Sequence, residues 1–170
     1  YFIPSEEGFD VLSAAIARGV RVCILTNSLA STDVPVVHAG YARWRPRLLS
    51  AGVELYEMRP DGVPHQRQLS PPSEASAKLH TKAIVVDRRQ VLVGSMNVDP
   101  RSRHINTEVA VLINSAVVGE ELITIFDEAV QPTHAYRLTM TEDGSTGRAI
   151  NWTATEGGES VAGHATHVRP

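Results

Sequence analysis

The alternation of apolar and polar positions predicts a chain in which helices and strands follow one another. Apolar residues recur at the spacing of an amphipathic helix in three segments, residues 5–18, 36–51 and 115–130. Short apolar runs rich in β-branched residues, which are typical of strands, cover residues 20–26, 53–58, 79–86, 90–93, 107–113, 136–140 and 149–153. Because short turns link helices to strands, we expect an α/β fold, with a mixed β-sheet flanked by helices on both faces.

Two stretches depart from this pattern. Residues 59–77 contain four prolines and little periodicity, which predicts a long irregular connection. From residue 154 onward the chain is rich in Gly, Ser, Thr and Glu and poor in apolar residues. We therefore expect one domain over residues 1–153 and a flexible C-terminal tail over residues 154–170.

The run at residues 79–86 begins with a polar pair. His80 and Lys82 are two positions apart, and side chains at that spacing share one face of a strand. Both parities are apolar through residues 83–86, which predicts a strand buried on both faces. An imidazole beside an ammonium does not stabilise an apolar core, whereas the two groups together would bind a phosphate group.

The polar residues of this region follow fixed spacings. His80, Lys82 and Asp87 form H-x-K-x4-D, then Gly94, Ser95 and Asn97 form G-S-x-N, and Glu108 follows. The set resembles the HKD motif of the phospholipase D superfamily, and the joint match at fixed offsets makes coincidence remote. The flanking residues 26–33, 38–41 and 53–57 resemble the C-terminal half of bacterial two-motif members, above all the cardiolipin synthase branch.

This resemblance implies one half of the phospholipase D fold and one half of its active site. In the superfamily two motifs meet across a twofold or pseudo-twofold axis, one histidine forms a phosphohistidine, and the other protonates the leaving group. The chemistry agrees, because one imidazole cannot be nucleophile and acid in the same step. If this chain is the second half of a two-motif parent, the resemblance implies that His80 is the acid–base partner and that the first half supplies the nucleophile.

The remaining motif residues suit the same chemistry. Lys82 would place its ammonium on a non-bridging phosphate oxygen, and Ser95 and Asn97 would donate hydrogen bonds to the same group. Glu108 would accept the Nδ1 proton of a histidine and so fix the tautomer of that ring.

Two motif residues are expected to act structurally. Gly94 lets backbone approach closely. Asp87 lies at a turn about 16 Å along an extended strand from Lys82, which is too far for a shared task.

The loop after the first predicted strand is open to two interpretations. Asn27, Ser28 and Asp33 lie in a position that commonly carries substrate contacts, and His38 follows at the start of a helix. Capping and packing explain the same residue types equally well. We therefore treat them as candidates for a substrate loop.

Charge narrows the substrate class. The chain of 170 residues has a formal net charge of −3, which argues against a surface built for non-specific nucleic-acid binding. Between residues 78 and 108, six basic residues outnumber three acidic ones. This local excess suits an anionic substrate without implying a long polyanion.

The sequence also bears on anchors and cofactors. No apolar run is long enough to cross a bilayer. Since the chain begins at Tyr1 rather than Met, we expect a piece of a longer parent, through which any membrane association would occur. We find no nucleotide-binding loop, flavin fingerprint or cluster of metal ligands, so we expect no cofactor and no metal.

Three functions are consistent with these features. The first is a half-domain of a metal-independent, cardiolipin synthase-like phosphatidyltransferase acting on a phospholipid or other phosphodiester, bacterial and cytoplasmic or peripheral at the inner membrane. Its partner would be a second HKD half in the same parent chain. The alternative is a single-motif phosphodiesterase or nuclease whose second half is a homodimer mate. The third is a fragment that binds without catalysis.

Overall fold

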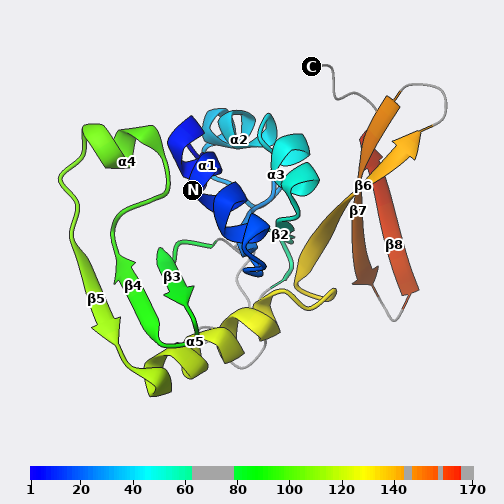
Figure 1. The fold of residues 1–170 in the computed structure, drawn as a ribbon. Coiled ribbons are helices and arrows are strands. Elements are labelled where there is room, and N and C mark those ends of the chain that lie inside the picture. Colours follow the sequence, from blue (N-terminus) through cyan, green and yellow to red (C-terminus); the bar gives the residue numbers. More distant parts are fainter. Residues whose placement is uncertain (63–78, 144–146, 157–158, 166–170) are drawn as a thin grey trace.

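The computed structural model describes residues 1–62, 79–143, 147–156 and 159–165, and Figure 1 shows its course. The helices are α1 (Glu6–Ala17), α2 (Pro35–Ala42), α3 (Arg45–Ala51), α4 (Pro100–His104) and α5 (Ala116–Ala129). The strands are β1 (Cys23–Asn27), β2 (Glu54–Met58), β3 (Ala83–Val86), β4 (Gln90–Gly94), β5 (Ala110–Asn114), β6 (Ala135–Asp143), β7 (Gly147–Glu156) and β8 (Glu159–Ala165). Most of the irregular connection expected at residues 59–77 lies outside the described residues.

Side-chain caps mark where several helices begin. Ser5 caps α1 by accepting a hydrogen bond from the Gly8 N–H at 3.2 Å, and Ser115 caps α5 in the same way. Asp99 caps α4, which the periodicity did not predict because it has only five residues. Its signal was local instead, an Asp followed by a Pro in the first helical turn.

The helix predicted over residues 36–51 is two helices, and Pro46 explains the break. Pro46 lies in the first turn of α3, where a missing N–H costs nothing. Gly52 ends α3 with a φ of 96°, a left-handed conformation that favours glycine. Pro46 therefore starts a second helix rather than kinking one long helix.

The strands form two sheets. One is mixed, with the order β1-β2-β6-β7-β8, in which β1 and β2 are parallel and the other pairs antiparallel. The other is antiparallel, with the order β3-β4-β5. On β2, Leu55 packs in the cluster that contains Leu48 of α3, whereas the Tyr56 ring meets Phe126 of α5 at 6.5 Å. Adjacent strand residues face opposite ways, so helices cover both faces of β2, as predicted.

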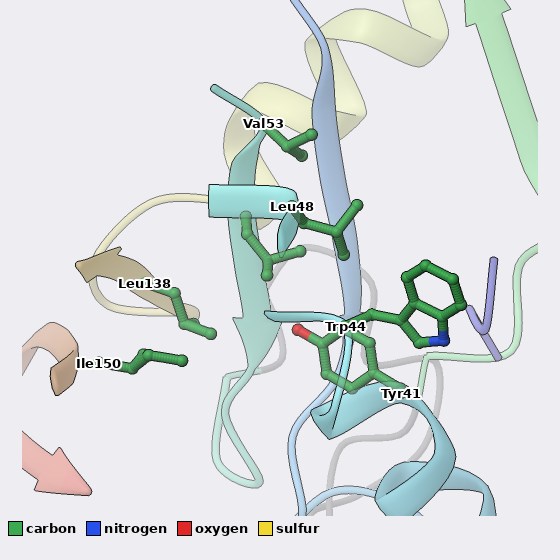
Figure 2. Close-up of a cluster of buried hydrophobic side chains, with 7 residues drawn as sticks. Tyr41, Trp44, Leu48, Val53, Leu138 and Ile150 are labelled. Carbon is green, nitrogen blue, oxygen red and sulfur yellow. The ribbon is translucent and has the colours of Figure 1, made fainter. Parts of the chain in front are cut away.

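The core lies between α2, α3 and the mixed sheet, and most of its buried side chains are apolar (Figure 2). Glu57, whose side chain is 2% exposed, is one of the buried polar residues beside this core. This carboxylate accepts hydrogen bonds from the Tyr41 hydroxyl at 2.9 Å, the Arg45 guanidinium at 2.7 Å and the Trp152 indole at 3.0 Å. A buried charge is tolerated only when it is paired and hydrogen-bonded, so Glu57 joins β2 to α2, α3 and β7.

The motif strand differs from the prediction in two respects. The strand β3 begins at Ala83, so His80 and Lys82 precede it rather than lying within it. It is also not buried on both faces, because Ile84 and Val86 are each 47% exposed. The helix α5 packs on one face of the small sheet, where Val91 is fully buried. The sequence pattern showed that both faces of β3 are apolar, but not whether other elements cover them.

The predicted flexible tail is wrong for most of its length. Residues 154–156 continue β7, and residues 159–165 form β8, which pairs antiparallel with β7. Main-chain hydrogen bonds hold an edge strand, so its side chains can be polar and give little periodic signal. Residues 166–170 lie outside the described part of the chain.

Within the described ranges, no helix is both long and apolar enough to span a bilayer.

Gly119 provides a test of how α5 packs on the motif hairpin. A β-carbon at Gly119 would stand 2.1 Å from the Arg88 carbonyl oxygen, whereas one at Gly8, also in a first helical turn, would meet nothing closer than 3.6 Å. We expect Gly119→Ala to lower the free energy of unfolding by about 1–3 kcal/mol, through overpacking. Gly8→Ala should be neutral or stabilising, because alanine favours helix. Urea unfolding checks both variants, and equal stabilities would contradict the described packing.

Candidate functional site

Three strand ends meet at one edge of the small antiparallel sheet. Because neighbouring strands run in opposite directions, the start of β3, the end of β4 and the start of β5 lie together, at the upper end of these strands in Figure 1. The Gly94 N–H donates to the Lys82 carbonyl at 3.2 Å, and the Ser95 N–H donates to the Val109 carbonyl at 2.9 Å. The motif residues around these positions are therefore neighbours in space.

Gly94 is required by the closeness of β4 and β5. A β-carbon at Gly94 would lie 2.1 Å from the Val109 carbonyl oxygen and 2.7 Å from the Ala110 α-carbon. Any side chain would push the start of β5 away from the end of β4. Glycine permits this close approach because it has no side chain.

Ser95 and Glu108 form a direct pair across this edge. The Ser95 hydroxyl donates to the Glu108 carboxylate at 2.5 Å and accepts from the Val109 N–H at 3.1 Å. The Asn106 amide donates to the other carboxylate oxygen at 3.2 Å. The hydrogen bond from Ser95, followed by those from Asn106 and Ser102, lowers the pKa of Glu108, and the Lys82 charge adds to this. Glu108 is thus held as an ionised acceptor.

Asn106 and Ser102 were not predicted as site residues. Asn106 is separated from Glu108 by one residue, so in an extended segment both side chains can point the same way. That spacing was a usable signal. Ser102 lies in α4, which the periodicity did not reveal, so nothing in the sequence placed it beside Glu108.

His80 and Lys82 lie side by side along the chain just before β3. The Lys82 ammonium donates to the His80 carbonyl oxygen at 2.7 Å, so it folds back over the main chain of the histidine. The His80 side chain is exposed, and its ring makes no hydrogen bond to any residue that the structure describes. The ring is therefore open to an incoming ligand or to a second protein surface.

Asn97 lies in the same neighbourhood as Lys82. Its side-chain oxygen lies 3.0 Å from the main-chain nitrogen of Tyr1. Lys82 lies within electrostatic range of the same nitrogen, so Asn97 and Lys82 lie at the same edge.

Asp87 lies at the opposite end of β3 from Lys82, in the turn to β4. Asp87 and Arg88 have φ values of 51° and 54°, the left-handed pair that a tight hairpin turn needs. Arg88 pairs with Glu120 and Arg89 donates to Asn114, so neither turn arginine is engaged with Asp87. Asp87 thus lies at the far end of β3 from Lys82, and its structural role stays a prediction.

The candidates for a substrate loop are mostly turned inward. Asn27 is buried and hydrogen-bonds the main chain of Leu79, and the buried Ser28 hydroxyl lies 3.1 Å from that of Ser31. His38 is buried, and its Nε2 lies 2.7 Å from the Arg45 guanidinium. Their polar atoms are engaged within the protein, which favours the packing interpretation for these three.

Asp33, the fourth loop candidate, is exposed and accepts a hydrogen bond from the Tyr1 hydroxyl at 2.5 Å. This contact raises the pKa of the Tyr1 hydroxyl to about 12. A role for Asp33 in substrate contact stays a prediction.

In the part of the chain that the structure describes, no three His, Cys, Asp or Glu side chains gather to hold a metal ion.

Comparisons with known proteins show what the chain is similar to. Residues 1–130 match the family model described as "Cardiolipin synthase, PLD-like domain". The chain is 42% identical over 156 residues to cardiolipin synthase C of Escherichia coli, covering 89% of this chain and 32% of that protein. It is 29% identical over 140 residues to cardiolipin synthase A of Pectobacterium carotovorum, covering 82% of this chain and 25% of that protein.

A solved structure shows a similar fold. The phospholipase D family member Nuc from Salmonella typhimurium superposes with a TM-score of 0.51 at 22% identity, covering 75% of this chain and 72% of that one. The chain thus spans about a third or less of the two cardiolipin synthases but nearly three quarters of Nuc.

The Ser95–Glu108 contact can be tested by titration. Replacing Ser95 with Ala removes the largest cause of the lowered pKa of Glu108, so that pKa should rise toward the ordinary glutamate value. Carbon NMR of the glutamate carboxyl groups as a function of pH measures the shift. Ser50→Ala on α3 is the control and should leave the Glu108 titration unchanged. An unmoved Glu108 titration in the Ser95 variant would contradict the contact.

Proposed function

The chain belongs to the family of cardiolipin synthase phospholipase D-like domains, and from that premise we propose that it is one half of a phosphatidyltransferase. The reaction would transfer a phosphatidyl group from one phospholipid to an alcohol acceptor, with hydrolysis when water is the acceptor. The observation that carries this proposal is the convergence of Lys82, Ser95, Asn97 and Glu108 at one sheet edge, beside an exposed His80.

The chain's own residues would bind and polarise the phosphodiester. Lys82 would exchange its contact with the His80 carbonyl for a non-bridging phosphate oxygen, where negative charge develops in the transition state. Asn97 and Ser95 would supply further hydrogen-bond donors to the same group. This arrangement provides fixed positive charge without a metal ion, and we propose that the reaction is metal-independent.

Two histidines would divide the chemistry. A ring nitrogen of one attacks phosphorus as the bond to the leaving oxygen breaks, and the other histidine gives its proton to that oxygen. The acceptor alcohol then attacks the phosphohistidine and loses its proton to the second histidine, which restores both rings. His80 would be the acid–base member if the first half of the parent supplies the nucleophile.

Glu108 would orient a histidine of the assembled site. An ionised carboxylate fixes a histidine tautomer by accepting its Nδ1 proton, and the hydrogen bonds to Glu108 keep it ionised. Among the described residues its partners are Ser95, Asn106 and Ser102, all of them polar neutral groups. A histidine brought by a second half would complete this set.

The apolar face of the small sheet supports such a second half. Ile84 pairs in register with Leu92, and Leu92 pairs with Leu112, so these side chains share the face away from Val91. Ile84 is 47% and Leu112 is 70% exposed. Contiguous exposed apolar side chains mark interaction surfaces. We propose that the other motif-bearing half of the same full-length polypeptide covers this face, since the chain spans only 32% of cardiolipin synthase C.

The alternative is a phosphodiesterase or nuclease built from two copies of this chain. One observation favours it: the chain covers 72% of Nuc, so a phospholipase D family member need not be much longer. The net charge of −3 and the cardiolipin synthase relatives favour a lipid substrate instead. We further propose that the parent acts at the cytoplasmic side of the inner membrane as a peripheral protein.

His80 is the most direct residue to test. In the full-length protein, His80→Ala should reduce turnover of a phospholipid in vesicles by on the order of 10²–10⁴-fold or more, the usual contribution of an acid–base group. His134→Ala, in the turn before β6 and not among the residues assigned to the site, is the control and should keep full turnover. Near-normal activity in the His80 variant would show that the role is wrong.

The choice between the two functions is also measurable. Full-length protein given phosphatidylglycerol vesicles should form a new phospholipid, detected by mass spectrometry, and should leave DNA intact. Sedimentation measures the oligomeric state, and the lipid-forming activity should not depend on dimer formation. DNA cleavage that requires a dimer, with no lipid product, would support the alternative and contradict the proposal.

A further inference from the structure

The amide of Asn27 holds the main chain immediately before His80. Asn27 is the last residue of β1, and its Nδ2 donates to the Leu79 carbonyl at 2.9 Å. The Leu79 N–H donates to the Asn27 Oδ1 at 2.8 Å. One side chain thus satisfies both main-chain groups of Leu79, as a neighbouring strand would. We call this pair of hydrogen bonds the Asn27–Leu79 clamp.

The clamp is needed because His80 lies outside the sheet. The ladder that holds β3 begins at Lys82, whose carbonyl accepts from the Gly94 N–H at 3.2 Å. His80 lies between that bond and the clamp, and its side chain is exposed. Its main chain is therefore fixed from one side by the sheet and from the other by Asn27.

The orientation of the Asn27 amide is itself fixed. The Ser31 hydroxyl is fully buried and lies 3.4 Å from Asn27 Oδ1 and 3.1 Å from the Met58 carbonyl. The Ser28 N–H donates to the same hydroxyl at 2.9 Å. The buried loop after β1 therefore presents the amide oxygen toward the Leu79 N–H and the amide nitrogen toward its carbonyl.

A second buried network holds the main chain of Asn27. Arginine has no acceptor, so the Arg45 guanidinium must donate to His38 Nε2, which leaves that ring neutral with its proton on Nδ1. The His38 ring in turn hydrogen-bonds the Asn27 main chain, while burial and the Arg45 charge lower the pKa of His38. Arg45 is anchored by the buried Glu57. Asn27 is thus tied to the core as well as to Leu79.

We propose that Asn27 is a positioning residue for His80, acting through Leu79. This inference rests on the proposed catalytic role of His80, and it gives the buried loop residues a task other than substrate contact. Since the His80 carbonyl also holds the Lys82 ammonium at 2.7 Å, a displaced segment would move both motif side chains. Misplacing reacting groups by about 1 Å can cost on the order of 10²-fold in rate.

The test uses Asn27→Ala and Asn27→Asp in the full-length protein. Alanine removes both hydrogen bonds of the clamp, and aspartate keeps the shape but cannot donate to the Leu79 carbonyl when ionised. Both should lower kcat by on the order of 10- to 100-fold with KM nearly unchanged, because binding groups remain but are misaligned. Asn114→Ala, whose amide oxygen accepts from the exposed Arg89, is the matched control and should keep kcat.

Amide hydrogen exchange supplies a readout independent of activity. In Asn27→Ala the Leu79 amide should exchange faster, while the amides of β6 and β7 keep their protection. In Asn27→Asp the Leu79 amide should stay protected, because its acceptor is retained. Unchanged exchange and unchanged kcat in both variants, with His80→Ala inactive, would overturn the clamp but not the proposed function. Faster exchange together with an active His80→Ala would overturn the function but not the clamp.

Discussion

The antiparallel pairing of β3, β4 and β5 is the constraint on which the site depends. It brings the start of β3, the end of β4 and the start of β5 to one edge, and with them residues well separated along the chain. The pairing is tight at that edge, because no side chain fits at Gly94 against the Val109 carbonyl. Main-chain hydrogen bonds hold Lys82 and Val109 at this edge, and the Ser95 and Asn106 side chains hold the Glu108 carboxylate. A site with such support is preorganised, which is what electrostatic stabilisation of a transition state requires.

A second set of interactions reaches the site from the core. The buried Glu57 accepts hydrogen bonds from Tyr41, Arg45 and Trp152. Arg45 also contacts His38, which lies just after the loop that follows β1. Removing one partner of a buried charge pair typically costs about 3–5 kcal/mol, so this network resists change. The same buried carboxylate that joins the sheet to its helices therefore also steadies the segment that precedes the motif histidine.

The sequence predicted the motif and its hairpin well, because fixed covalent spacing and turn chemistry are local properties. The spacing of His80, Lys82 and Asp87 put the first two near one end of a strand and the third in the turn at the other end. What covers a strand is not local. The apolar residues 83–86 suggested burial on both faces, yet Ile84 and Val86 remain half exposed in this chain.

The same limit explains the other differences. Asn27 and His38 carry the residue types of a substrate loop, and only tertiary contacts show that Leu79 and Arg45 occupy their polar atoms. The strand β8 escaped prediction because its partner β7, and not its own side chains, holds it in place. Local patterns identified the chemical groups, whereas long-range contacts decided which of them face solvent.

The most direct measurement is a crystal structure of the full-length protein with bound vanadate, a mimic of the phosphoryl group in transfer. The anion should lie at the edge formed by β3, β4 and β5, with the Lys82 ammonium and the Asn97 amide each within about 3 Å of its oxygens. The rings of His80 and of a second motif histidine should approach it from opposite sides. An anion bound elsewhere, or a His80 ring turned away from an anion bound at this edge, would contradict the assignment of the site.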